Sequence, residues 1–436
     1  MPRLLCFMFC LLPALASADP VHLRIQGSNT IGATLAPALV RGLLLAEGAG
    51  DIRALPGAVA NEQTLLAQST AAEPIRIDIA AHGSSTGFAG LGSGHADLAA
   101  SSRPIREAEA SQLRALGDLR SSRSEQVIGL DGVAVIVHPE NPLSQLTTVQ
   151  LAQVFSGEIQ RWEQLGVAGG AIRLYARDDR SGTFETFKGL VLAPRRNELS
   201  TQARRFESSE ELADQVKADR QAIGFSSLTA VHGAKVLAIA EGQAPAMLPS
   251  PARVASEDYP LSRRLFFYLP ENAAQPLARA LADFAQSPAG QAIVAEQGFI
   301  SQQVKALPIT AQAGMPPRYR VLAEGAKRLS VNFRFQEGSA GLDNKALRDV
   351  QRVADYLRKT GKLQDKVVLV GFGDPKETPG RAALLSRLRT LAVRRELARS
   401  GVEPKNLIGL GDQMPVAGND LEQGRLRNRR VEVWVY

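Results

Sequence analysis

The chain has 436 residues, 44% of them hydrophobic, and a formal net charge of +7. This length suggests two or three domains, and this ordinary apolar content excludes a globally disordered chain. No apolar run is long enough to span a bilayer, which predicts a mature protein without a membrane span. The charge is uneven, because residues 320–436 hold 23 Lys and Arg against 14 Asp and Glu.

The first eighteen residues have the pattern of a signal peptide. Arg3 precedes the apolar run Leu4–Ala16, and the small residues Ala16 and Ala18 frame a cleavage site before Asp19. The sequence therefore predicts export to the periplasm and a mature N-terminus at Asp19. Export makes nucleic acid an improbable partner for the basic C-terminal region, and an anionic wall polymer a more fitting one.

Both cysteines, Cys6 and Cys10, lie inside this segment. The mature chain is then expected to lack disulfides, thiolate metal sites and cysteine nucleophiles. Phe7–Phe9, before Cys10, lacks the small residues that a lipoprotein signal has. The five histidines are scattered without metal-ligand spacing, so neither a metal nor a cofactor is expected.

Short β-rich runs alternate with helical stretches from residue 21 to about 305. The clearest runs are Val21–Gln26, Ile75–Ala80, Gly132–His138 and Ala171–Ala176. This alternation predicts an α/β fold with largely parallel sheets. The Pro- and Gly-punctuated residues 306–318 are predicted to form a linker.

A second, smaller α/β pattern follows the linker. It contains strands at Ser330–Phe335, Lys366–Phe372 and Arg430–Tyr436, with helices between them. In the first of these helices Leu347, Val350, Ala354 and Leu357 recur at helical spacing. Residues 319–436 are therefore expected to be a domain of their own.

The most informative stretch for function is a strand-to-helix turn at residues 177–183. A strand ends near Arg177, and Ser181, Gly182 and Thr183 open the next helix. Free N–H groups at a helix start favour an anion, and glycine lets the backbone approach closely. Two hydroxyls and a guanidinium add donors suited to tetrahedral oxygens. An ordinary helix cap is the structural alternative.

Two further turns rich in Gly, Ser and Thr follow predicted strands. One is Gly27–Gly32, which includes Thr30 and Ile31, and the other is His82–Gly87, which includes Ser84 and Ser85. Open α/β sheets bind ligands at the carboxyl ends of their strands. The three turns together therefore predict one anion site.

These motifs, in this order, resemble the phosphate-binding proteins of ABC importers over residues 21–305. The resemblance includes Ser101-Ser102-Arg103-Pro104, Asp131–Pro142 and Thr148–Trp162. It implies a type II periplasmic-binding-protein fold of two lobes that close on phosphate, with an ABC importer as a possible partner. It also implies that Asp179 pairs with Arg177. By position, the implied phosphate contacts are Thr30, Ile31, Ser84, Ser85, Ser102, Arg177, Ser181, Gly182 and Thr183.

Ser102 departs from the pattern of some family members, which have an aspartate at this position. A carboxylate there can accept the proton of hydrogen phosphate and would repel sulfate. Serine accepts a hydrogen bond but repels nothing. Discrimination between phosphate and sulfate therefore stays open.

Residues 83–87 also match G-x-S-x-G, the nucleophile elbow of serine hydrolases, with His95, His138 or His232 as candidate bases. The segment after it is glycine-rich, which is poor for a supporting helix, and no acid–histidine pairing is evident. The sequence thus favours a non-catalytic protein, with hydrolysis as the least favoured alternative.

Residues 319–436 resemble OmpA-like peptidoglycan-binding domains, which implies a βαβαβ-type α/β sandwich. In that family an aspartate and an arginine fifteen positions later clamp diaminopimelate of the wall stem peptide; Asp374 and Arg389 have that separation. An internal ion pair is the structural alternative. The family's histidine, threonine, glycine and asparagine near this aspartate are replaced by Phe372, Gly373, Glu377 and Ala382.

The sequence as a whole predicts a periplasmic receptor for phosphate or a similar oxyanion, held at the cell wall or outer membrane by its C-terminal domain. The predicted boundaries are 1–18, 19–305, 306–318 and 319–436. The main alternative is a structural envelope protein whose cleft no longer binds a ligand.

Overall fold

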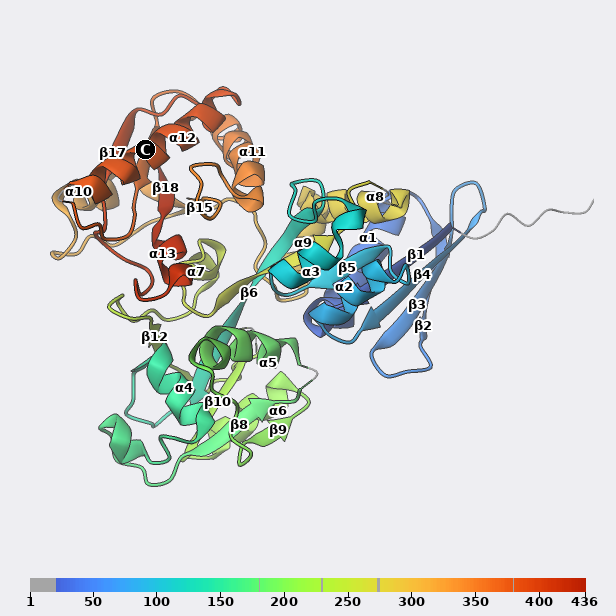
Figure 1. Cartoon of the computed structure of the whole chain (residues 1–436), viewed down its shortest axis with the longest axis horizontal. Helices are drawn as coiled ribbons and strands as arrows, with labels where there is room; N and C mark the ends of the chain where they lie inside the picture. Colours follow the sequence, from blue (N-terminus) through green and yellow to red (C-terminus); the bar gives the residue numbers. More distant parts are fainter. Residues whose placement is uncertain (1–20, 180, 229, 273–274, 379) are drawn as a thin grey trace, which may run out of the picture.

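The computed structural model describes residues 21–436 except Arg180, Thr229, Ala273, Ala274 and Pro379. The predicted signal peptide and both cysteines lie outside these residues. Figure 1 shows three bodies: lobe 1 (residues 21–130 and 262–303), lobe 2 (131–261) and a C-terminal domain. No helix in the described part of the chain has the length and apolarity needed to cross a membrane. The two-lobed α/β prediction is confirmed.

Lobe 1 is a sheet with strand order β2-β3-β4-β1-β5-β13-β6 and helices packed on it. β1 is parallel to β4 and β5, whereas β13 is antiparallel to both β5 and β6. Its elements are β1 (Val21–Gly27), α1 (Ala36–Ala46), β2 (Gly50–Pro56), β3 (Glu62–Gln68), β4 (Pro74–Ala81), α2 (Ser84–Gly92), β5 (Leu98–Ser101), α3 (Glu107–Gln112), β6 (Glu125–Val137), β13 (Ser262–Tyr268), α8 (Pro276–Gln286) and α9 (Pro288–Glu296).

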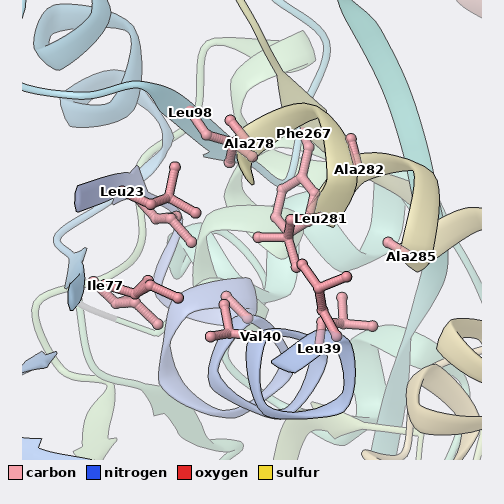
Figure 2. Close-up of a cluster of buried hydrophobic side chains, with 14 of the residues drawn as sticks. Leu23, Leu39, Val40, Ile77, Leu98, Phe267, Ala278, Leu281, Ala282 and Ala285 are labelled. Atoms are coloured by element: carbon pink, nitrogen blue, oxygen red, sulfur yellow. The ribbon is translucent and has the colours of Figure 1, made fainter. Parts of the chain in front are cut away.

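The core of lobe 1 lies between this sheet and helices α1 and α8. Figure 2 shows Leu23 and Ile77 from the strands meeting Leu39 of α1 and Leu281 of α8, all fully buried. α8 forms because Pro276 fits its first turn and Gln275 accepts a hydrogen bond from the free N–H of Ala278 (2.8 Å). Each buried leucine or isoleucine stabilises the lobe by roughly 1.5–3 kcal/mol.

The long strand β6 joins the lobes, because its first half pairs with β13 and its second half pairs with β10 of lobe 2 (Figure 1). In lobe 2, β8 lies between β10 and β9 and is parallel to both. The lobe contains β7 (Gln145–Thr147), α4 (Thr148–Ser156), β8 (Arg173–Arg177), α5 (Gly182–Phe187), β9 (Arg204–Phe206), α6 (Ser209–Ala218), β10 (Ala222–Ser227), β11 (Lys235–Val236), β12 (Ala238–Ala240) and α7 (Pro251–Ala255).

The C-terminal domain is a sheet of order β14-β15-β18-β16-β17 with helices beside it. Residues 306–307, at the start of the predicted linker, form β14 and pair with β15. The elements are β14 (Ala306–Leu307), α10 (Pro317–Gly325), β15 (Lys327–Arg334), α11 (Asn344–Lys359), β16 (Val367–Gly371), α12 (Arg381–Ala398), β17 (Asn406–Gly409), α13 (Glu422–Asn428) and β18 (Arg430–Val435).

The C-terminal domain is held against lobe 2 by buried charges. The carboxylate of Asp258 accepts hydrogen bonds from Arg328 (2.7 Å) and Asn332 (2.8 Å), and all three side chains are buried or nearly so. Arg427 pairs with Glu241 (2.5 Å) and also donates to the main-chain oxygen of Asp258 (3.0 Å). Because each buried charge has a partner, this interface avoids the cost of an uncompensated ion.

The same domain also contacts lobe 1, through α11. Asp343, which caps α11, forms an ion pair with Arg264 of β13 (2.9 Å). Three α11 side chains donate to lobe 1: Asn344 to Glu125 (3.1 Å), Arg348 to Gln126 (3.0 Å) and Arg352 to Gln302 (3.1 Å). The C-terminal domain therefore touches both lobes and the strands that join them.

Candidate functional site

A cavity of about 500 Å³ lies between the lobes, where strand-end turns from both meet. Its lining includes the following predicted site residues: Thr30 from lobe 1, and Arg177, Ser181, Gly182 and Thr183 from lobe 2. The structure thus brings together residues that are about 150 positions apart in the chain. Ile31 lies in the core of lobe 1, and its N–H donates to the oxygen of Ser28 (3.2 Å).

Helix α5 begins at this cavity. Ser181 caps it and accepts a hydrogen bond from the N–H of Phe184 (3.4 Å). Gly182 lies against lobe 1 so closely that a Cβ built on it would be 1.2 Å from Thr30 Oγ1 and 2.9 Å from Thr30 Cα. The two lobes are therefore in contact here, and only glycine fits between them.

Arg177, at the end of β8, has its guanidinium fixed by lobe 2. It donates to the main-chain oxygens of Phe206 (3.3 Å) and Glu207 (2.6 Å), and also to Ser209. Burial lowers the pKa of Arg177, and nearby acidic groups oppose this shift. The expected pairing with Asp179 is wrong, because Asp179 points to Arg205 instead (2.5 Å). Main-chain oxygens and the Ser209 hydroxyl hold this fork.

Asp131 and Arg263, on the joining strands β6 and β13, form a buried ion pair beside the cavity. The Asp131 carboxylate accepts from Arg263 Nε (3.2 Å) and from an Arg263 terminal nitrogen (3.0 Å). That terminal nitrogen also donates to Thr30 Oγ1 (2.8 Å). The other terminal nitrogen is buried without a hydrogen-bond partner among the described residues. A donor of this kind next to Thr30 suits an anion.

Ser84 and Ser102 are buried together at the lobe boundary, outside the cavity lining. Their hydroxyls lie 3.3 Å apart, and Ser84 Oγ accepts from the N–H of Ser102 (3.1 Å). Ser102 Oγ donates to Glu185 of α5 across the cleft (2.9 Å). Where some related proteins carry an aspartate, this chain therefore has a serine next to a carboxylate from the other lobe.

Ser85, the candidate nucleophile, accepts a hydrogen bond from Arg103 (2.9 Å), which also pairs with Glu109. Among the described residues no histidine hydrogen-bonds to it: His95 bonds to Ser93 and His232 to Asp214. A nucleophilic serine needs a base within hydrogen-bond reach. This geometry therefore does not support the hydrolase alternative. Within the described residues, no cluster of His, Cys, Asp and Glu has the arrangement of a metal site.

In the C-terminal domain, Asp374 follows β16 and is buried. Arg429 binds its two oxygens with two bonds of 2.9 Å, and Lys376 adds a third contact of 2.7 Å. Burial raises the pKa of Asp374, but these hydrogen bonds outweigh burial and hold it well below the usual range. Arg389 lies nearby, donating weakly to the oxygen of Phe372 (3.4 Å) and covering the ring of Phe335. Asp374 is therefore already paired within the domain.

The sequence analysis missed four groups at these sites. They are Asp131 with Arg263, Glu185, Ser209 and the pair Lys376 with Arg429. Asp131 opens a motif that the sequence analysis used only to support the family resemblance. Glu185, Ser209 and Arg429 meet their partners only through folding, so no local spacing could have found them. Lys376 is two positions from Asp374, and this spacing was not considered.

Two family models match this chain, one within the two-lobed region and one within the C-terminal domain. The family model described as PBP superfamily domain matches residues 49–289, which is more than half of the chain. The model of the OmpA family matches residues 334–429. The resemblance of the chain to these two kinds of domain is therefore confirmed.

Several individual proteins are similar to the two-lobed region. Protein SphX of Synechococcus elongatus is 28% identical over 280 residues, covering 61% of this chain and 79% of that protein. Phosphate-binding protein PstS of Pseudomonas aeruginosa is 27% identical over 249 residues, covering 53% and 76%. The crystal structure of an ABC-type phosphate transport receptor from Vibrio cholerae covers 64% of this chain and 99% of its own, with a TM-score of 0.51 and 22% identity.

Proposed function

Because this chain belongs to the PBP superfamily and carries an OmpA family domain, we propose that it is an envelope receptor with two binding functions. The cleft between its lobes binds phosphate or a closely similar oxyanion. The C-terminal domain binds peptidoglycan through its diaminopimelate stem peptide. The protein would act in the periplasm, in phosphate capture, transport or sensing, and not as an enzyme.

One observation carries the anion proposal: donor groups of both lobes converge on one cavity. The N-terminus of α5, the hydroxyls of Ser181 and Thr183, and Arg177 come from lobe 2, and Thr30 comes from lobe 1. An anion at this point would gain the helix dipole and charge-assisted hydrogen bonds together. Relatives of the two-lobed region are named for phosphate, which supports the same ligand.

The carboxylates near the cavity favour a ligand that carries a proton. Asp131 lines it and is neutralised by Arg263, and Glu185 lies at the lobe boundary next to Ser102. Hydrogen phosphate can donate its proton to a carboxylate, whereas sulfate at neutral pH cannot. Asp131 is therefore a carboxylate acceptor in the cavity lining, and Glu185 adds a second carboxylate next to Ser102, outside that lining. We propose phosphate over sulfate on this ground.

Arg177→Ala should weaken phosphate binding by about 30-fold or more. Removing one partner of a buried charged contact typically costs about 2–5 kcal/mol, which is roughly 30-fold to several-thousand-fold in affinity. Titration calorimetry with phosphate and with sulfate measures this directly on the wild-type protein and the variant.

Arg173→Ala is the matched control, because Arg173 lies on the same strand and is largely exposed in its pair with Asp219. It should bind phosphate like the wild type. An Arg177→Ala protein with unchanged affinity would contradict the site. A wild-type protein that binds none of the anions would favour the alternative of a structural envelope protein with an inactive cleft.

The wall proposal depends on Asp374 and Arg389, one anion and one fork-shaped cation at the end of β16. Diaminopimelate presents an ammonium and carboxylates, so this pair has the complementary charges. Lys376 occupies the place beside Asp374 that a ligand ammonium would take. Binding then requires exchange of one ammonium for another, which predicts modest affinity.

Asp374→Ala and Arg389→Ala should each reduce co-sedimentation of the full chain with diaminopimelate-containing sacculi at moderate salt. Exposed charges are screened beyond about 8 Å at physiological ionic strength, whereas contacts within a buried site are screened less. Asp374→Ala makes the domain more basic, so attraction by charge alone would give stronger binding in this variant.

Asp412→Ala makes the same change of charge at an exposed position and serves as the control. Each variant is compared only if it unfolds cooperatively near the wild-type temperature. If Asp374→Ala binds as well as Asp412→Ala, there is no clamp at Asp374, and the domain adheres through its basic surface.

A further inference from the structure

Helix α12 carries an apolar stripe that no other part of the described chain covers. Leu384, Leu388 and Leu391 are spaced four and three residues apart, so they share one face of the helix. They are 60%, 50% and 41% exposed, whereas Val393 and Leu397 on the opposite face are fully buried. The core of the domain uses the buried face of α12, so about half of the surface of these three leucines stays open to solvent.

Arginines border this stripe on both sides. Arg387 and Arg394 lie along one side of it, and Arg381 and Arg399 lie along the other; all four are exposed. Residues 381–399 contain six arginines and one acid, Glu396, which pairs with Arg399 (2.6 Å). Arg381, Arg387 and Arg394 form no ion pair with any described residue. Arg395 is also exposed and follows Leu391 by one helical turn, so it lies in line with the stripe at its C-terminal end. The exposed face of α12 is thus apolar along the centre of its earlier turns, and positive along its edges and at its C-terminal end.

The helix has room for a partner on this face. The main packing partners of α12 are β16, β17, β18 and α11, which all belong to its own domain. In Figure 1 it lies on the side of the C-terminal domain that is away from both lobes. Arg389, the proposed wall ligand, covers Phe335 and points inward, not along the leucine stripe.

We propose that the exposed face of α12 binds the surface of a membrane that contains anionic phospholipids. The leucines would enter the boundary between head groups and acyl chains, and the flanking arginines would meet the phosphate groups. This arrangement of charges is the reason for choosing a membrane over a second copy of the chain. Two copies packed through this face would bring arginines against arginines without an acid to neutralise them.

The test is co-flotation of the full-length mature protein with vesicles. We expect binding to vesicles of phosphatidylcholine with 30% phosphatidylglycerol and none to pure phosphatidylcholine. Arg387→Glu/Arg394→Glu and Leu384→Ser/Leu388→Ser should each weaken binding by at least about tenfold. The matched controls are Arg41→Glu and Leu45→Ser on the exposed face of α1, which should bind like the wild type. All these positions are exposed, so the variants are expected to fold.

A tryptophan at the stripe reports insertion directly. The two natural tryptophans, Trp162 and Trp434, are fully buried and give a constant background. Leu388→Trp should shift its emission to shorter wavelength on anionic vesicles, and Leu45→Trp should not. Binding that the leucine substitutions leave unchanged would overturn the proposal in favour of simple charge attraction. Absence of vesicle binding together with a dimer that Leu384→Ser/Leu388→Ser dissociates would overturn it in favour of self-association.

Discussion

Gly182→Ala should weaken phosphate binding by roughly 5-fold to 150-fold without unfolding the protein. Its new methyl group would lie 1.2 Å from Thr30 Oγ1 and within 2.9 Å of the Thr30 backbone, so a side-chain rotation cannot relieve the overlap. Overpacking of this kind costs typically 1–3 kcal/mol, and here the lobes can avoid it by opening. A cleft that cannot close loses the contacts from one lobe, so the cost appears in ligand affinity and not in stability.

Gly189→Ala is the matched control, because it lies one helical segment further in the same lobe and nothing is within 4 Å of its added Cβ. Calorimetry with phosphate and a thermal unfolding curve distinguish the two effects. Gly182→Ala with wild-type affinity would mean that phosphate does not bind between the closed lobes. A large loss of thermal stability in Gly182→Ala would mean that the glycine serves the fold instead.

Asp258→Ala should destabilise the full-length protein by about 3–5 kcal/mol, because it leaves Arg328 buried without its main carboxylate partner. The same change also removes one of the two acceptors of Asn332. Chemical denaturation of the whole chain measures this loss. Asp214→Ala, which breaks an exposed contact with His232 in the same lobe, should cost less than about 1 kcal/mol.

The pH dependence of this interface gives a second measurement. Burial raises the pKa of Asp258, but the charges of Arg328, Arg430 and Arg334 outweigh burial and lower the pKa to about 2. A carboxyl whose pKa is depressed on folding stabilises the protein above its ordinary pKa, near 4, and loses this contribution as the pH falls towards 2. The wild type should therefore lose more stability than Asp258→Ala between these pH values. Equal losses would show that this carboxylate does not hold the domains together.

Much of the fold could be predicted because the signal was local. The runs Val21–Gln26 and Ile75–Ala80 lie within β1 and β4 to within one residue, because a strand buried mainly on one face alternates apolar and polar residues. The residues of helix α11 that face the core were predicted less well. Helical spacing predicted Leu347 as a core residue. Leu347 is instead 41% exposed, and the smaller Ala346 next to it lies in the core.

The candidate site was predictable only where its residues lie in strand-end turns. Thr30 lies just after β1 of lobe 1, and Arg177 and Ser181 lie at and just after the end of β8 of lobe 2, so strand ends from both lobes face one cavity. The partners of these residues were not predictable in the same way. Asp179 is close to Arg177 in sequence, yet its side chain meets Arg205, and the fork of Arg177 is held by main-chain oxygens of residues that are distant in sequence.

The contact of the C-terminal domain with both lobes has a mechanical consequence. A receptor joined to a wall-bound domain by a flexible linker could turn its cleft in any direction, and the free-energy cost would come only from the conformational entropy of the linker. In this protein the Asp258–Arg328 pair joins the C-terminal domain to lobe 2, and α11 joins it to lobe 1. These contacts fix the cleft relative to the C-terminal domain. If the wall holds that domain, every opening of the lobes must strain or release one of these contacts. A force on the C-terminal domain and a ligand in the cleft would then both change the angle between the two lobes.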